Sequence, residues 1–124
     1  MTLKEAVDRF DHLYPNPLTI AEKRKILSDF DGQLFAQVLV HYEGTPDIFT
    51  GYDETAAPDT ALLVPYPYDD VYLKLLCAET DAVCGDTARY NNSAALFNAA
   101  YEQYVAHVNR TRTRRDGLRL RFDT

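Results

Sequence analysis

A chain of 124 residues with 46% hydrophobic content can form one compact domain with one core, but it is too short for two full-sized domains. No apolar run approaches the roughly 20 residues that a membrane-spanning helix needs. The charged residues among the first eleven positions also argue against a secretion signal. We therefore expect a soluble, unexported protein.

The net charge of -6 is distributed unevenly along the chain. Residues 1–109 carry seven Lys/Arg and seventeen Asp/Glu, whereas residues 110–124 carry six Arg and two Asp. An acidic body disfavours wrapping along nucleic acid. A basic end favours docking onto an acidic protein surface or a phosphate backbone.

The first predicted element is an amphipathic helix over about residues 3–13, with Thr2 as its N-cap. Its apolar residues recur at steps of three and four: Leu3, Ala6, Val7, Phe10, Leu13 and Tyr14. Pro15 and Pro17 end this helix, because neither proline can donate a helical hydrogen bond.

Thr19 and Glu22 match a capping box, which predicts a second helix from there to about Glu43. Gly44 lies beyond its expected end. The predicted core face consists of Ile20, Leu27, Phe30, Leu34 and Val38.

Residues 44–67 lose the helical period and contain several Gly and Pro, which predicts a loop of roughly twenty residues. The loop is too apolar for a purely solvated linker. It either packs on its own domain or contacts another subunit, and the sequence leaves both alternatives open.

Pro67 fits the first position of a third helix, with Asp69 and Asp70 in its first turn. This helix is apolar almost all round, which indicates a central helix or one covered by another chain. Cys77 and Cys84 lie about 10 Å apart along it, too far to bridge, and we interpret both as reduced, buried side chains. Gly85 can end the helix in left-handed geometry.

A fourth helix to about Arg110 should pair with the third as an antiparallel hairpin. Its apolar seam can pack along a neighbour and consists of Tyr90, Ala94, Phe97, Tyr101, Tyr104 and Val108. Residues 111–117 are polar, and residues 118–122 alternate apolar and charged like a strand. A lone strand is unstable, so this end is either disordered or adds to the sheet edge of a partner.

Together these elements predict a mainly α fold, a small four-helix bundle with a long loop between helices two and three and an extended C-terminal arm. We expect residues 1–110 to form the helical domain and residues 111–124 to form the basic arm.

The sequence gives no sign of a catalytic residue, a metal site or a cofactor. It has no glycine-rich phosphate loop, dinucleotide fingerprint or nucleophile elbow. No histidine or cysteine stands at paired ligand spacing from another. We interpret the carboxylate pairs Asp29/Asp31, Asp53/Glu54 and Asp69/Asp70 as ordinary features of an acidic protein, and the nine tyrosines as interface rings rather than base-stacking platforms.

The hairpin region resembles small phage and prophage proteins of the head-tail connector family. The resemblance is carried by residues 63–72, with a Pro67-Tyr68-Asp69 turn, and by residues 88–101, with the helix start Arg89-Tyr90-Asn91-Asn92-Ser93. Residues 27–32 and 51–53 and the opening helix also match that pattern. The sequence departs from it over residues 76–86 and in the arginine-rich end.

The resemblance implies a virion structural protein of the phage neck, assembled in the host cytoplasm as a dodecameric ring below the portal. Such an adaptor binds the portal protein, neighbouring copies and the next neck or tail-completion protein. DNA passes through the ring without sequence-specific binding, and no membrane, enzyme activity or cofactor is involved.

Two groups of residues carry this hypothesis. The portal-binding arm would use Arg112, Arg114, Arg115, Leu118, Arg119, Leu120, Arg121 and Phe122. The inter-subunit contacts would use Phe49, Tyr52, Tyr66, Tyr68, Arg89, Tyr90, Asn91 and Asn92. For Asn91, Asn92 and Ser93, local capping and hairpin geometry stay open as the alternative.

Two other classes of function compete with the connector. The first is a small nucleic-acid-binding or regulatory phage protein that grips phosphate with its basic tail, against which the acidic body argues. The second is an enzyme with an unrecognised site in the long loop, against which the lack of any nucleophile beside a base argues.

Overall fold

The structure is a computed structural model that describes residues 1–43, 48–52 and 56–114. The fold is mainly α-helical, as predicted. Its elements are α1 (Leu3–Leu13), α2 (Ile20–Gln37), the short 3-10 helix η1 (Leu39–His41), α3 (Val71–Cys84) and α4 (Thr87–Thr111). Within the described ranges, β structure is limited to two isolated bridges, Thr2 with Ala61 and Tyr42 with Arg114.

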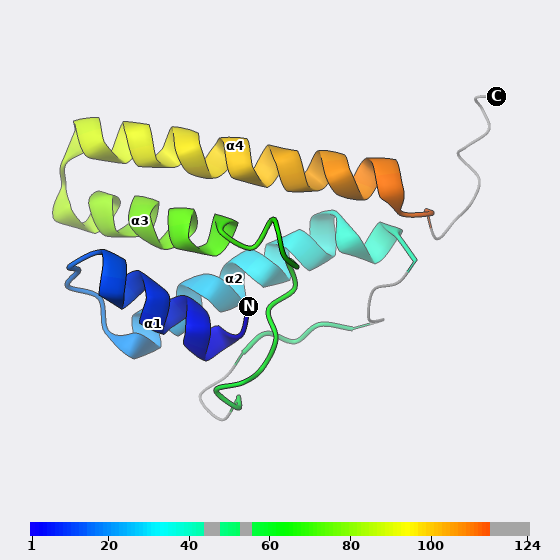
Figure 1. Cartoon of the computed structure of the whole chain (residues 1–124), viewed down its shortest axis with the longest axis horizontal. Helices are drawn as coiled ribbons and strands as arrows, with labels where there is room; N and C mark the ends of the chain where they lie inside the picture. Colours follow the sequence, from blue (N-terminus) through cyan, green and yellow to red (C-terminus); the bar gives the residue numbers. More distant parts are fainter. Residues whose placement is uncertain (44–47, 53–55, 115–124) are drawn as a thin grey trace.

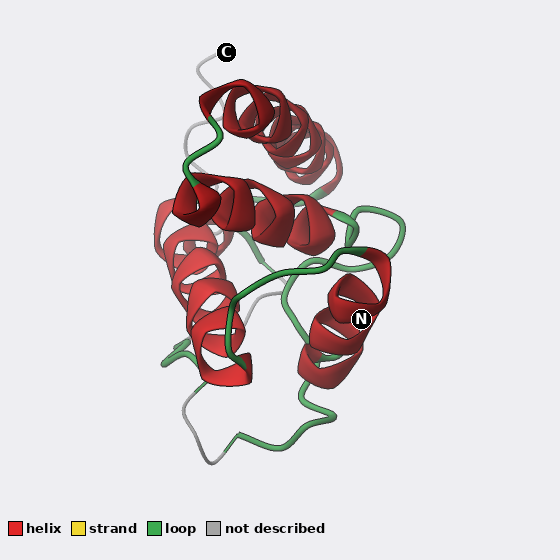
Figure 2. Cartoon of the chain, turned by 90° about the vertical axis from the view of Figure 1, so that its left-hand side faces the viewer, coloured by secondary structure: helices red, strands yellow, loops and turns green. Residues whose placement is uncertain are grey.

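The helices form a bundle in which α3 is central. Figure 1 shows α3 and α4 as an antiparallel hairpin, with α1 and α2 on the other side of α3. The end view in Figure 2 shows α1 and α2 side by side, with α3 above them and α4 outermost. The nearly all-round apolar character of α3 is therefore explained largely by cover from within the chain.

Local capping fixes the starts of α1 and α2. Thr2 accepts the Glu5 backbone N–H at 3.1 Å, and Glu5 accepts the Thr2 N–H at 2.9 Å. The same reciprocal pair joins Thr19 and Glu22 at 3.0 and 2.8 Å. The predicted N-cap at Thr2 and the predicted capping box at Thr19 are confirmed. Both could be predicted from the sequence because these bonds join residues only three positions apart.

The course of α2 differs from the prediction in two ways. The helix ends at Gln37 and not near Glu43, because a 3-10 turn follows that buries both Leu39 and Tyr42. The predicted core residue Ile20 is 61% exposed. The buried stripe is instead formed by Lys23, Leu27, Asp31, Leu34 and Phe35.

The start of α3 was also placed wrongly. Pro67 lies in a turn, where the Tyr68 N–H donates to the Pro65 carbonyl at 2.9 Å, and α3 begins at Val71. Asp70 is therefore the residue before the helix and makes no side-chain capping bond. The predicted end of α3 is confirmed, since Gly85 follows it with a left-handed φ of 77°.

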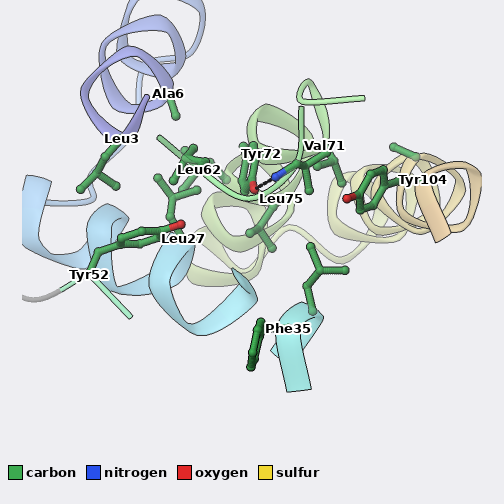
Figure 3. Packing of buried hydrophobic residues seen from close by; sticks show 14 of the residues in the cluster. Leu3, Ala6, Leu27, Phe35, Tyr52, Leu62, Val71, Tyr72, Leu75 and Tyr104 are labelled. Carbon is green, nitrogen blue, oxygen red and sulfur yellow. Dashed lines mark hydrogen bonds between the residues drawn. The ribbon is translucent and has the colours of Figure 1, made fainter. Parts of the chain in front are cut away.

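The core joins all four α-helices and the long loop. Figure 3 shows Leu3 and Ala6 of α1, Leu27 of α2 and Tyr72 of α3 among the packed side chains, with Leu62 of the loop between them. Phe30 of α2 adds edge-to-face contacts with Tyr72 and with Phe97 and Tyr101 of α4, at centroid distances of 5.6 to 5.7 Å.

The described parts of the long loop pack on their own domain. The Leu3 N–H donates to the Thr60 carbonyl at 2.8 Å, and the Leu62 N–H donates to the Met1 carbonyl at 3.0 Å. Leu62 and Val64 are buried. Of the two alternatives left open by the sequence, packing within the chain holds for these residues.

Candidate functional site

A buried carboxylate, Asp31, is the polar centre of the molecule. It lies on α2 with no exposed surface. It accepts three hydrogen bonds: from the Tyr52 hydroxyl at 2.5 Å, from the Tyr72 hydroxyl at 2.7 Å and from the Leu63 backbone N–H at 3.0 Å. Tyr72 in turn accepts the Val64 N–H at 2.8 Å. The network ties two points of the long loop to α2 and α3.

Burial dominates the acid–base behaviour of this network. It raises the pKa of Asp31 above its ordinary value, although the bonds from Tyr52, Leu63 and Tyr72 oppose that shift. The pKa of each of the two tyrosines is also raised, by burial first and then by the neighbouring Asp31 carboxylate. Both phenols are therefore neutral donors at physiological pH.

A second anchor holds the loop beside Tyr52. Ser28 accepts the Tyr52 backbone N–H at 2.9 Å. Gly51 has a φ of 90°, and a Cβ at this position would lie 2.6 Å from the Ser28 hydroxyl oxygen. A larger residue would be strained by this backbone conformation and would have to displace the Ser28 hydroxyl, so Gly51 favours this anchor beside Tyr52.

The Asp31 network is built for cohesion. Its oxygens are enclosed, its phenols stay protonated, and a backbone N–H supplies the third bond. Nothing in this arrangement places a nucleophile beside a base that a substrate could reach. The sequence interpretation of Asp31 as an ordinary acidic residue was therefore wrong. One signal was present, since Asp31 stands between Leu27 and Leu34 on the core stripe of α2.

A smaller polar cluster lies where α3 and α4 meet. The buried Asp81 accepts a short hydrogen bond from the Ser93 hydroxyl, and the Arg89 guanidinium lies 3.8 Å from it. Asp86 caps α4 by accepting the Arg89 N–H at 3.1 Å. Of the two roles considered for Ser93, contact with a neighbouring subunit or local hairpin geometry, the structure shows a hydrogen bond within the hairpin. Asn91 and Asn92 are exposed.

The predicted inter-subunit residues separate into two sets. Tyr52 is buried in the chain's own core, and Phe49 packs against Phe35 and Tyr52. Tyr68 is half-buried beside Tyr104 and His107 of α4. The exposed set consists of Tyr66, Arg89, Tyr90, Asn91 and Asn92.

Only the beginning of the predicted arm lies within the described residues. Arg114 pairs with Tyr42 in an isolated antiparallel bridge, and its guanidinium carbon lies 5.4 Å from the Tyr42 ring centroid. The Glu43 N–H donates to the Thr113 carbonyl at 2.8 Å. These contacts place Thr113 and Arg114 beside Tyr42 and Glu43, which follow η1, and Arg112 directly follows α4. The predicted residues Arg115, Leu118, Arg119, Leu120, Arg121 and Phe122 lie outside the described residues.

One end of the molecule carries exposed apolar side chains that were not predicted from the sequence. Large apolar side chains are exposed where α1 ends and where α3 turns into α4: Leu13, Tyr14, Val83 and Tyr90. Figure 1 shows these segments together at the left, opposite the point where the chain leaves α4. Leu13 and Tyr14 continue the apolar face predicted for α1, but the chain covers neither fully.

The two cysteines differ in burial. Cys77 is half-buried, whereas Cys84 is exposed, so its predicted burial is wrong. No group of three or more His, Cys, Asp or Glu in the described ranges could hold a metal ion. Among the same residues, no helix has the length and apolar character to cross a membrane.

Comparison with known proteins adds no relative. No family model, no curated protein and no solved structure matches the chain.

Proposed function

We propose that this chain is a structural head-tail connector subunit of a phage neck, which assembles as a ring below the portal and links the DNA-filled head to the tail. The observation that carries the proposal is a convergence of the segments that resemble that family. Residues 27–32, 51–53 and 63–72 are far apart in sequence, yet Asp31, Tyr52, Leu63 and Tyr72 from these segments meet in one hydrogen-bonded network. The segments that carry the resemblance are therefore neighbours in the folded chain, which supports the proposal.

The chemistry of the described residues supports assembly over catalysis. The buried carboxylates Asp31 and Asp81 are enclosed by donors from the chain itself. Four exposed apolar side chains, Leu13, Tyr14, Val83 and Tyr90, lie at one end of the bundle, where burial against another protein would stabilise a complex. The acidic body is suited to a protein that lets DNA pass without gripping it.

In this proposal the two ends of the molecule have different partners. The basic arm, from Arg112 to Phe122, docks on the portal protein, with apolar side chains supplying affinity and arginines fixing register. Exposed residues of the hairpin contact neighbouring copies in the ring: Arg89, Tyr90, Asn91 and Asn92. Tyr66, 85% exposed in the turn before α3, is the remaining exposed candidate.

The proposal is tested by co-sedimenting the purified chain with the portal protein of its phage. Two variants are compared with the full chain: one ends after Arg114, which keeps the Tyr42–Arg114 contact, and one has residues 115–124 in scrambled order. The scrambled arm keeps the charge and removes the alternation of apolar and basic residues. Binding by the full chain alone, near one copy per portal subunit, is expected. Absence of binding by the folded full chain would overturn the proposal.

A further inference from the structure

The first residues after α4 are tied back to the segment that follows α2. The Glu43 backbone N–H donates to the Thr113 carbonyl at 2.8 Å, and Tyr42 pairs with Arg114 in an antiparallel bridge. Figure 1 shows the ends of α2 and α4 on the same side of the molecule, where this pairing lies. We call Tyr42, Glu43, Thr113 and Arg114 the arm anchor, because they hold the beginning of the basic arm.

Tyr42 is the fixed half of the arm anchor. It is 6% exposed and belongs to the core cluster of the bundle. Its hydroxyl donates a hydrogen bond to the side-chain oxygen of Asn109 on α4, so the ring is held both by the core and by the last turns of that helix. A ring with so little exposure offers a partner protein almost no surface to contact.

Arg114 is the half of the arm anchor that comes from the arm. It is half-buried, and its guanidinium carbon lies 5.4 Å from the centroid of the Tyr42 ring. A cation within about 6 Å of an aromatic face is attracted by the ring. A short antiparallel pairing is marginally stable by itself, so this side-chain contact is needed to keep the arm anchor closed.

A closed arm anchor lowers the entropic cost of docking by the arm. An arm joined to the bundle only at Thr111, the end of α4, would lose the backbone freedom of residues 112–114 each time it docks. In the structure these residues are already hydrogen-bonded to the bundle before any partner is met. The arm should therefore bind more tightly with the arm anchor closed, even where the anchor itself does not contact the partner.

From these contacts we propose that Arg114 is a positioning residue: together with Tyr42 it fixes the point from which the arm leaves the bundle, and it does not itself dock on the portal. The inference rests on the connector function proposed above, in which the arm binds the portal protein. It changes the role of one residue of that arm, because the sequence alone placed Arg114 among the portal contacts.

Hydrogen exchange of the Glu43 amide in the isolated full-length chain tests the arm anchor without a portal. Arg114→Ala and Tyr42→Leu should each lower the protection of this amide about three- to tenfold. Arg110→Ala is the matched control, because it removes the same charge from an exposed position on the last turn of α4 and should leave the protection unchanged. Circular dichroism verifies the helical fold. Should Tyr42→Leu unfold, Asn109→Ala takes its place, because Asn109 is exposed and accepts the hydrogen bond of the Tyr42 hydroxyl.

Co-sedimentation of the same variants with the portal protein tests the positioning role. Each single variant should bind about three- to tenfold more weakly than the full chain, and the double variant should bind no more weakly than either, because both substitutions open the same arm anchor.

Three outcomes would overturn the inference: unchanged protection of the Glu43 amide in both single variants, losses of portal affinity that add in the double variant, or a loss caused by Arg114→Ala but not by Tyr42→Leu. The last two would mean that Arg114 contacts the portal directly. A full chain that fails to bind the portal, while its variants lose amide protection as expected, would overturn the connector function and support the arm anchor.

Discussion

At the scale of single residues, the stability of this molecule depends on Asp31. Its two carboxylate oxygens accept three hydrogen bonds, and an Asn side chain can accept only at one atom, so Asp31→Asn leaves at least one of these donors without its present partner. We expect the free energy of unfolding to fall by about 1–3 kcal/mol, measured by urea denaturation. Asp29→Asn is the matched control, because Asp29 lies on the same helix with an exposed partner, Lys25, and should change stability by less than about 0.5 kcal/mol.

The same carboxylate gives a pH dependence with a defined sign. Burial raises the pKa of Asp31, so between its unfolded and folded pKa values the folded chain holds a proton that the unfolded chain releases. The stability contributed by Asp31 is complete below its unfolded pKa and is lost as pH rises through the folded pKa. We therefore expect the stability difference between wild type and Asp31→Asn to be largest near pH 4, about the unfolded pKa of Asp, and to shrink toward neutral pH. A difference that grows toward neutral pH would mean that the three donors outweigh burial.

At the scale of elements, two glycines should respond to alanine with opposite signs. Gly85 ends α3 with a φ of 77°, a conformation that costs an alanine about 1–2 kcal/mol, so Gly85→Ala should lower the free energy of unfolding by about that amount. Gly32 lies inside α2, and a Cβ there would meet no atom within 4 Å, so Gly32→Ala should raise stability by about 0.5–1 kcal/mol. Urea denaturation of both variants tests the pair, and a stabilised Gly85→Ala chain would contradict the assignment of the helix end.

The elements also show which features can be predicted from sequence. The N-cap at Thr2, the capping box at Thr19 and the end at Gly85 were predicted correctly, because each depends on residues within one helical turn. The start of α3 was misplaced because a local turn from Pro65 to Tyr68 precedes the helix, and the end of α2 was misplaced because it depends on distant packing. Tyr42, for example, turns inward to donate a hydrogen bond to Asn109, sixty-seven residues away.

The candidate site was less predictable than the helices for a related reason. Helical period identified the apolar face of α2, but it could not show that Lys23 and Asp31 occupy the buried stripe while Ile20 is exposed. Both charges are buried because distant partners are supplied, Asp11 for Lys23 and two tyrosines for Asp31. Those partners come from other helices and from the loop, and a single sequence does not show which of its segments meet.

At the scale of the whole molecule, the separation of a basic arm from an acidic body distinguishes protein docking from nucleic-acid binding. Phosphate binding would depend on arginine charge and fall steeply with salt, and it would be insensitive to the apolar residues between the arginines. Docking on a protein partner would depend on those apolar residues, because buried apolar side chains supply most of the affinity of such contacts.

Two full-length variants therefore separate the connector from the nucleic-acid alternative. One replaces Arg115, Arg119 and Arg121 with Gln, and the other replaces Leu118, Leu120 and Phe122 with Ser. We expect the serine variant to lose portal co-sedimentation while keeping the weak, salt-sensitive DNA binding of the wild type. The glutamine variant should lose that DNA binding and keep part of its portal affinity. The contrary outcome is a serine variant that binds the portal as the wild type does and a glutamine variant that loses both the portal and DNA. Binding by the arm would then depend on its charge and not on its apolar residues, which would favour the nucleic-acid alternative over the connector.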